Sequence, residues 1–359
     1  MKQSRTLLIP VVGSSIMGVM AQNKPPNFTP GVKWQIDIMN TLDITKPLVP
    51  KDALVWDLDL YHLQRHPEIV DFLRKQIPDV SIICYFNAGL AQPSDCDWDS
   101  TWQTPAYKGL LGKSYSPPFG EEKWINIKNQ TGIDLIKRRV TLARDLGCDG
   151  IDPDNIDGYN SDANGDNGTG WNTNSDDYVK FVTQLATQAH GLKTKRGFPL
   201  MIGQKNAPEI APALSKILDF AVLEDCKNLR GEASRKFCAD FQPYITAGNP
   251  VFSIEYPTSL RDSKAAAQCK ATGADKAQFD NSCAVDTAPS GGTWGNYKYS
   301  EILKLRDSET DTPGELNGCT QYCGKQGSGV VVTATNEELD GDTCKAVPAS
   351  KRKARHVFW

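Results

Sequence analysis

The stretch Cys148-Asp149-Gly150-Ile151-Asp152-Pro153-Asp154-Asn155-Ile156-Asp157-Gly158-Tyr159 decides how the rest of this sequence is interpreted. It begins with the apolar pattern of a short strand and continues as a polar loop. Pro153 favours an extended conformation for the residue before it. Because side chains alternate along an extended segment, Asp152 and Asp154 share a face. Carboxylates this close repel one another when ionised, which raises some of their pKa values. The stretch is therefore either a solvated turn with capping aspartates or a functional group of acids.

The overall composition narrows the classes of protein to consider. The chain has 359 residues and a formal net charge of −3, with a sequence pI of about 5.9. This length suffices for one large domain or two average ones. The sequence has no basic patch of the kind that nucleic-acid binding requires. We expect a monomer that binds neither nucleic acid nor, once its leader is removed, a membrane.

The N-terminus has the pattern of a secretory signal over residues 1–21. Lys2 and Arg5 supply the positive charge, and an apolar run follows from Leu7 to Met20. Small residues precede Gln22, where cleavage is expected. The alternative is a membrane anchor, but the run is too short and interrupted to span a bilayer comfortably. We therefore predict a secreted, extracellular protein.

Ten cysteines agree with an oxidising compartment, and their even number allows complete pairing. Cys226 and Cys238 are the first pair we expect, because they are close and follow a strand. In the C-terminal part, we group Cys319 and Cys323 with Cys344, and Cys269 with Cys283. No histidine lies among them, so a zinc site is disfavoured. Sequons begin at Asn27, Asn129 and Asn167, as in secreted glycoproteins.

Eight apolar segments, most of them followed by helical patterns, predict a TIM-type (β/α)8 barrel. The expected strands are 34–38, 53–59, 80–86, 124–127, 148–154, 200–203, 219–224 and 250–256. The expected helices are 68–77, 133–146, 176–190, 210–218 and 232–247. A doubly wound open sheet is the alternative, but the first strand is not followed by a glycine-rich phosphate loop.

The regular pattern weakens after Tyr256. Residues 263–272 and 299–306 are predicted as helices that close the barrel domain, which we place at 22–306. Residues 307–359 contain three cysteines and a basic end. We interpret them as a disulfide-tied C-terminal extension.

Polar residues follow several predicted strands, at the end where a barrel of this type builds its active site. Glycoside hydrolysis uses two carboxyl groups, one as acid and one as nucleophile or base. Asp154 and Glu224 are the candidates, because strand ends two apart can place carboxyls within roughly 5–10 Å. Glu224 follows an apolar run after Asp219, which is consistent with a raised pKa. Pairing of Glu224 with Lys205 is the alternative role, and both can hold at once.

The stretch 148–159 resembles the signature of glycoside hydrolase family 114, the endo-α-1,4-polygalactosaminidases and spherulin-4-like proteins. Other stretches agree in order, and together the matches cover roughly residues 32–256. They are Trp34-Gln35, Asp57-Leu58-Asp59, Cys84-Tyr85-Phe86 with Gly89, Gly120-Glu121-Glu122-Lys123-Trp124 with Ile127, Arg139, Ala189-His190-Gly191-Leu192, Lys205-Asn206, Glu224-Asp225-Cys226 and Ile254-Glu255-Tyr256.

The resemblance implies a TIM-type barrel with Asp154 as nucleophile or base and Glu224 as general acid. It implies an endo-acting enzyme that cleaves an α-1,4-linked galactosamine polysaccharide, with no cofactor and no metal. An acidic cleft would attract such a cationic polymer. The residues expected to line the cleft are Asp57, Asp59, Tyr85, Asp152, Asn155, Asp157, Lys205, Asn206, Glu255 and Tyr256.

Three departures from the family pattern surround the expected cleft. Asp152 stands where the family usually has Glu. Gln92 stands at the position of a Glu that is normally followed by an Arg, and no Arg is present here. The loop 159–174 is longer and contains additional Asn, Asp and Gly residues.

Two other functions remain open from the sequence. The departure at Gln92 favours a glycan-binding protein of the same fold with impaired catalysis. A metal-dependent hydrolase using the aspartates is the other. The stretch 162–167 resembles the start of a calcium loop, but it lacks the sixth-position Gly, and Thr173 replaces the twelfth-position Glu.

Overall fold

The computed structural model describes residues 24–115, 121–160, 168–227, 232–257, 283, 294–306, 313–323, 329–336 and 344–345. The predicted signal 1–21, the helix 263–272, the calcium-like stretch 162–167 and the basic end all lie outside these residues. No helix within the described ranges combines the length and the apolar character needed to cross a bilayer.

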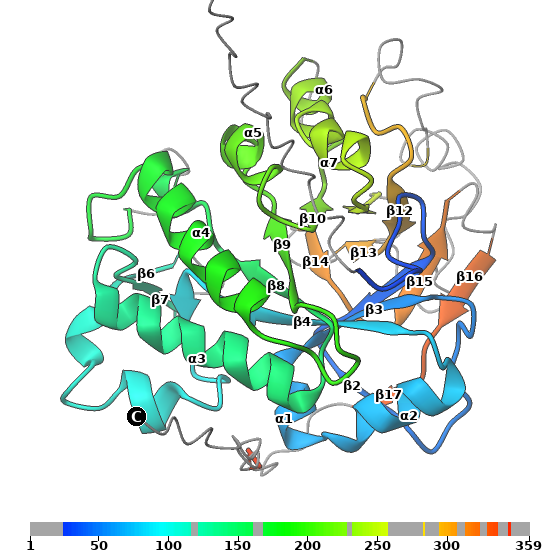
Figure 1. Cartoon of the computed structure of the whole chain (residues 1–359), viewed down its shortest axis with the longest axis horizontal. Helices are drawn as coiled ribbons and strands as arrows, with labels where there is room; N and C mark the ends of the chain where they lie inside the picture. The colour runs from blue at the N-terminus through cyan, green and yellow to red at the C-terminus, as the bar shows by residue number, and fades with distance from the viewer. Residues whose placement is uncertain are drawn as a thin grey trace, which may run out of the picture.

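Eight parallel strands make up most of a ten-stranded sheet, which curls in the order of a TIM-type barrel, as predicted (Figure 1). In spatial order they are β1 (Trp34–Asp37), β3 (Val55–Asp59), β4 (Ser81–Asn87), β8 (Gly150–Asp154), β9 (Met201–Lys205), β10 (Phe220–Glu224), β11 (Val251–Glu255) and β12 (Ser300–Leu303). Each strand neighbours the next one along the chain of this set, so the carboxyl ends meet at one edge.

Helices cover the outside of the sheet (Figure 1). They are α1 (Leu60–Arg65), α2 (Glu68–Gln76), α3 (Gln130–Leu146), α4 (Ser175–Gly191), α5 (Ala211–Leu214), α6 (Glu232–Ala239) and α7 (Gln242–Thr246). α3 begins where the Asn129 side chain accepts a hydrogen bond from the Thr131 N–H, 2.9 Å away, and ends at Gly147 with φ of 110°. Local capping thus sets both ends of this helix.

Alternation along the strands separates two apolar cores. Side chains such as Val55, Ile83 and Phe252 pack inside the barrel, whereas Trp56 and Ile82 pack between the sheet and its helices. At the carboxyl ends of the strands, the side chains that point into the barrel are polar. The fold therefore directs these polar side chains toward the barrel mouth.

Two predicted elements are wrong. Residues 124–127 are not a barrel strand, because β7 (Lys123–Ile125) pairs antiparallel with β5 (Leu90–Ala91) and β6 (Leu111–Ser114) in a separate sheet. Residues 299–306 are not a helix. They form β12 and β13 (Leu305–Arg306), and β12 is the eighth parallel strand. In both cases strand pairing across the fold overrides the local pattern.

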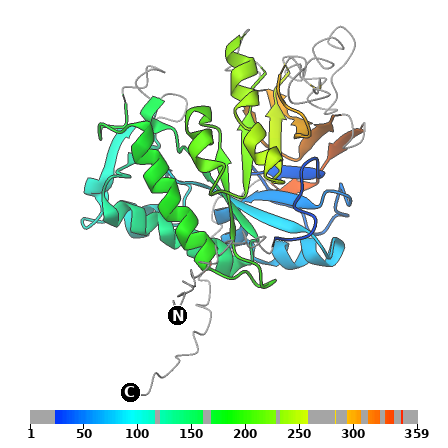
Figure 2. The same ribbon diagram turned by 45° about the horizontal axis from the view of Figure 1, so that its top comes forward.

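The last strands extend the barrel sheet. β15 (Cys319–Tyr322) pairs antiparallel with β12, and β16 (Gly329–Val332) pairs with β15. Of the others, β14 (Pro313–Glu315) pairs with β13, and β17 (Thr335–Asn336) pairs with β2 (Thr41–Leu42). Figure 2 shows the orange C-terminal strands against the blue N-terminal ones. Residues after 306 thus pair with strands of the barrel domain.

Disulfides tie distant parts of the chain. The described pairs are Cys84–Cys148, Cys96–Cys344, Cys226–Cys238 and Cys283–Cys323. The expected Cys226–Cys238 pair is confirmed. The groupings in the C-terminal part are wrong, because Cys283 pairs with Cys323 and Cys344 pairs with Cys96. The C-terminal Cys344 is tied to the barrel through Cys96, so the prediction of a disulfide-tied C-terminal part is also confirmed.

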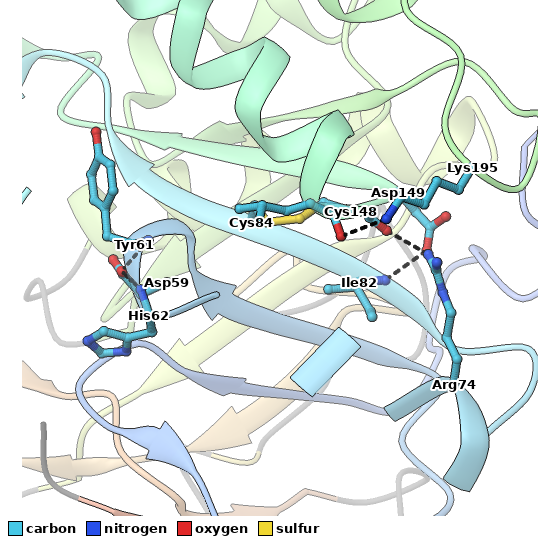
Figure 3. The surroundings of a disulfide bond; sticks show 11 residues. Asp59, Tyr61, His62, Arg74, Ile82, Cys84, Cys148, Asp149 and Lys195 are labelled. Carbon is cyan, nitrogen blue, oxygen red and sulfur yellow. Dashed lines mark hydrogen bonds and ion pairs between the residues drawn. A yellow bond between two sulfur atoms is a disulfide. The ribbon is translucent and has the colours of Figure 1, made fainter. Parts of the chain in front are cut away.

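The Cys84–Cys148 disulfide joins β4 to the residues before β8 (Figure 3). Beside it, the buried Asp149 carboxylate accepts hydrogen bonds from the Ile82 N–H at 3.1 Å and from Arg74 at 3.2 Å. These contacts fix the start of β8, the strand that carries Asp154.

Candidate active site

A cavity of about 310 Å³ opens at the carboxyl ends of the parallel strands. It is lined by Ile38, Tyr85, Asn87, Gln92, Tyr115, Glu122, Asp154, Asn155, Asp157, Lys205, Asn206, Glu224 and Leu316. Both predicted catalytic acids and five of the predicted cleft residues are in this set. The misassigned fourth strand shifts Asp154 and Glu224 to the fourth and sixth parallel strands, but they remain two strands apart.

Asp154 ends β8, and two hydrogen-bond donors and one nearby cation hold its carboxylate. The Tyr85 hydroxyl donates to Oδ2 at 2.6 Å, and the Asn155 N–H donates to Oδ1 at 2.8 Å. Lys205 Nζ lies 3.6 Å from Oδ2. The side chain is 20% exposed, so it is fixed in position yet open to the cavity.

The turn after Asp154 requires a close approach of two backbone segments. The N–H groups of Ala88 and Gly89 both donate to the Asp154 carbonyl, at 3.0 and 3.1 Å. A Cβ on Gly89 would lie 1.8 Å from the carbonyl oxygen of Asn155, which itself has a φ of 57°. Only glycine fits here, and its presence sets the direction of the chain leaving β8.

Glu224 ends β10 and faces the same cavity with 21% of its side chain exposed. The Tyr256 hydroxyl donates to its Oε1 at 2.5 Å. The Asn206 side chain accepts from the Glu224 N–H at 2.9 Å. The two acids are therefore arranged alike, each beside a tyrosine hydroxyl.

Lys205, from β9, lies between the two acids. Its Nζ atom is 3.2 Å from Glu224 Oε2 and 3.6 Å from Asp154 Oδ2, so these two oxygens are at most about 7 Å apart. Burial alone would lower the pKa of Lys205, but Asp154, Glu224 and Asp152 raise it above its ordinary value. The residue is thus a permanent cation between two carboxylates.

A second cavity of about 460 Å³ adjoins the first and shares Asp157, Asn206 and Glu224 with it. Its other walls are Asn160, Ala207, Pro208, Glu209, Lys236, Phe237 and Asp240. Glu224 therefore lies where two cavities meet. This arrangement gives space on both sides of a bond held at Glu224.

The lateral sheet forms a wall of the first cavity that the sequence did not predict. Glu122 precedes β7, Gln92 follows β5, and Tyr115 follows β6. Because β7 is antiparallel to both neighbours, these three positions converge at one edge of the sheet. Within the quoted family motifs, Glu122 was available as a signal, but it was not singled out as a site residue.

Four of the remaining predicted residues lie below or beside the cavity. Asp57 and Asp152 are fully buried under the site, with Asp152 close to Lys205, and burial raises the pKa of Asp152 to about 7. Asp59 caps α1, accepting from Tyr61 N–H at 2.8 Å. Glu255 is buried and accepts from the Lys227 N–H at 3.3 Å.

Tyr256 also does not line the cavity but reaches it through its hydroxyl bond to Glu224. Asp157 lines both cavities, and burial, followed by the charge of Asp154, raises its pKa to about 6. The predicted set thus divides into cavity residues and a supporting layer.

Metal binding has little support in the described part of the chain. The side chains that converge closely enough to hold an ion there are Cys226, Cys238 and Glu255. Cys226 and Cys238 are joined in a disulfide, so neither offers a thiolate.

A TIM-type barrel whose carboxyl edge presents two acids a short distance apart is the arrangement that glycoside hydrolases use. The family comparison identifies the particular group: residues 19–328 match the model of glycoside-hydrolase family GH114, and the chain belongs to that family. The protein is therefore a glycoside hydrolase, and the resemblance noted in the sequence is confirmed.

Solved structures agree with this assignment. The chain is 27% identical to Ega3 of Aspergillus fumigatus, crystallised in complex with galactosamine, with a TM-score of 0.62 over 84% of this chain and 98% of that one. It is similar in fold to the glycoside hydrolase domain of PelA from Pseudomonas aeruginosa, at 12% identity and a TM-score of 0.51 over 81% of this chain and 98% of that one. A search of curated proteins finds no match.

Proposed function

We propose that this protein is a secreted, endo-acting glycoside hydrolase that cleaves α-1,4-linked galactosamine polysaccharide. One observation carries the proposal: Asp154 and Glu224 face one cavity, with carboxylate oxygens no more than about 7 Å apart. The cavities on either side of Glu224 suit a polymer that continues past the cleaved bond.

Asp154 serves as nucleophile and Glu224 as general acid. Asp154 accepts hydrogen bonds from the Tyr85 hydroxyl and the Asn155 N–H, and Glu224 accepts from the Tyr256 hydroxyl and Lys205. One of the donors to Asp154 is a backbone N–H, and such a bond favours the ionised carboxylate that a nucleophile requires. A separation of no more than about 7 Å is compatible with retention, for which carboxyls lie about 5–5.5 Å apart.

The charge of the cavity supports a cationic substrate. Its wall contains four carboxyl side chains and one cationic side chain, and that cation is already paired with two of the carboxyls. The likeness to Ega3, whose structure contains galactosamine, points to the same sugar. A polymer with free amino groups would be attracted to such a site.

The proposal is tested by incubating purified protein with partly de-N-acetylated α-1,4-galactosaminan and sizing the products. We expect rapid shortening by the wild-type enzyme, and a loss of about 10³-fold or more in Asp154→Asn and in Glu224→Gln. Asp176→Asn, a change of an exposed acid in α4, is the control and should match the wild type.

Three results would contradict the proposal. Cleavage of only neutral polymers would reject the substrate. Full activity in Asp154→Asn would reject the assigned nucleophile. Binding of intact polymer with no cleavage would favour the alternative of a glycan-binding protein, for which Gln92 in the cavity wall is the motivating feature.

A further inference from the structure

Glu122 is the acid in the cavity wall that the proposed chemistry leaves unused. It lies immediately before β7, on the lateral sheet rather than on the barrel. Its Oε2 atom accepts a hydrogen bond from Asn87 Nδ2 at 3.5 Å. Asn87 in turn pairs across the sheet with Asp154. Glu122 therefore lies on the β4 side of Asp154, and Glu224 lies on the β10 side.

Glu122 has no cationic partner among the residues that the structure describes. The lysine next to it, Lys123, donates to Ser114 instead. Burial, followed by the charges of Asp154 and Asp95, raises the pKa of Glu122 to about 7. A partly buried carboxyl without a counter-ion favours a ligand that brings a positive charge.

We propose that Glu122 binds the ammonium group of a galactosamine unit held over Asp154, and so sets the preference of the cavity for de-N-acetylated polymer. The inference rests on the proposed function and adds the residue that recognises the amine. A sugar ring placed over Asp154, with its scissile bond toward Glu224, has its far side toward the lateral sheet. Glu122, Gln92 and Tyr115 are the cavity residues on that side.

The positive charge of Lys205 is already offset by Asp154 and Glu224, between which this residue lies. Lys205 therefore does not oppose the binding of an ammonium group at Glu122. The titratable groups that face Glu122 are Asp154 on β8, Asp95 after β5 and Tyr85 on β4. Asp154 and Asp95 are carboxyl groups, whereas burial raises the pKa of Tyr85 and keeps its hydroxyl neutral. A bound ammonium group would therefore reduce the repulsion between Glu122 and these two carboxylates. An N-acetyl group has no charge and would gain none of this stabilisation.

The experiment compares Glu122→Gln with Glu121→Gln, a change of the adjacent exposed acid. KM and kcat are measured on de-N-acetylated and on fully N-acetylated polymer, and calorimetry measures the binding of galactosamine and N-acetylgalactosamine. In Glu122→Gln we expect KM for the de-N-acetylated polymer to rise about 10- to 100-fold. We expect kcat to change less than about threefold, because the amide keeps the shape of the side chain. Glu121→Gln should behave as the wild type.

The pH dependence gives a second readout. Between pH 5 and 7 the wild-type KM for the de-N-acetylated polymer should fall as Glu122 ionises, and this trend should be absent in Glu122→Gln. Thermal unfolding shows whether the variant is folded. If it is not, Glu122→Asp replaces it and should keep part of the preference for the amine.

Equal loss on both polymers, or no change on either, would overturn the role of Glu122. The two proposals fail differently. A wild-type enzyme that cleaves no galactosaminan contradicts the proposed function. If Glu122→Gln nevertheless binds galactosamine more weakly than the wild type does, the role of Glu122 in recognising the amine survives.

Discussion

Lys205 Nζ lies 3.2 Å from Glu224 Oε2, and the side chain of this lysine is only 1% exposed. It is also 3.6 Å from Asp154 and close to the buried Asp152. One buried cation thus offsets three acids at the centre of the site, and its removal should affect both activity and folding.

Replacement of Lys205 by Met should lower the free energy of unfolding by about 3 kcal/mol or more, because it leaves buried carboxylates without a counter-charge. We also expect kcat to fall at least about 100-fold. Chemical denaturation and steady-state kinetics measure the two effects. Lys33→Met is the control, since Lys33 pairs with the exposed Asp52 and should change stability by less than about 1 kcal/mol. A fully active Lys205→Met variant would contradict this view.

The hydroxyl of Tyr85 positions the Asp154 carboxylate from 2.6 Å away. Tyr85→Phe removes a hydrogen bond to a charged group, which is worth about 1.5–3 kcal/mol. We therefore expect kcat/KM to fall about 10- to 100-fold with little change in melting temperature. Tyr322→Phe is the control, because the Tyr322 hydroxyl donates to the Trp34 carbonyl at 2.8 Å and this residue lines neither cavity. Equal losses in the two variants would show that Tyr85 has no special role.

Gly89 allows the backbone of β4 to approach the turn after Asp154. In Gly89→Ala, the new Cβ would meet the Asn155 carbonyl oxygen, 1.8 Å away, and the backbone would have to move. We expect a loss of about 1–3 kcal/mol in stability and a large loss of activity. Gly109→Ala provides the control, because a Cβ added at Gly109 would have no neighbouring atom within 4 Å. Melting curves and activity assays compare the pair, and a normal Gly89→Ala enzyme would refute the argument.

Arg139 is a buried cation that contacts the backbone of Asn87, a residue of the cavity wall. Its guanidinium donates to Asp95 and Asp97, each at 2.7 Å, and to the Asn87 carbonyl at 2.6 Å. Arg139→Met should destabilise the fold by about 3–5 kcal/mol, because it leaves a buried carboxylate unpaired. Arg138→Met changes the exposed neighbour in α3 and should have little effect. Urea denaturation of both variants tests the difference, and similar midpoints would count against it.

Stability should depend on pH through Glu122, whose pKa rises from the ordinary 4.5 to about 7, chiefly because of burial. An acid with a higher pKa in the folded chain binds more protons when folded. Its contribution to stability is present at low pH and is lost as pH rises through the folded value. The free energy of unfolding of the wild type relative to Glu122→Gln should fall by about 2–3 kcal/mol between pH 4.5 and 7. Denaturation at several pH values measures this, and a constant difference would contradict it.

The sequence could predict the positions of those site residues that directly end a barrel strand. Asp154 and Glu224 end apolar strands, and alternation together with parallel pairing brings such ends to one edge. The prediction of the cleft residues was less accurate, because only five of the ten line the first cavity. Asp57 and Glu255 also lie on strands, but their burial depends on how far each strand extends into the barrel.

By itself, the sequence determined the barrel class, the family motifs, the place of Asp154 and Glu224 at strand ends, and the Cys226–Cys238 disulfide. Each of these is encoded by neighbouring residues or regular spacing. Tertiary structure alone decided that residues 123–125 leave the barrel for a lateral sheet, and that residues 300–303 supply the eighth strand. Short segments have weak intrinsic preferences, so the partners available across the fold determine their pairing. The same cause placed Glu122 in the cavity wall, since its position depends on contacts with strands distant in the chain.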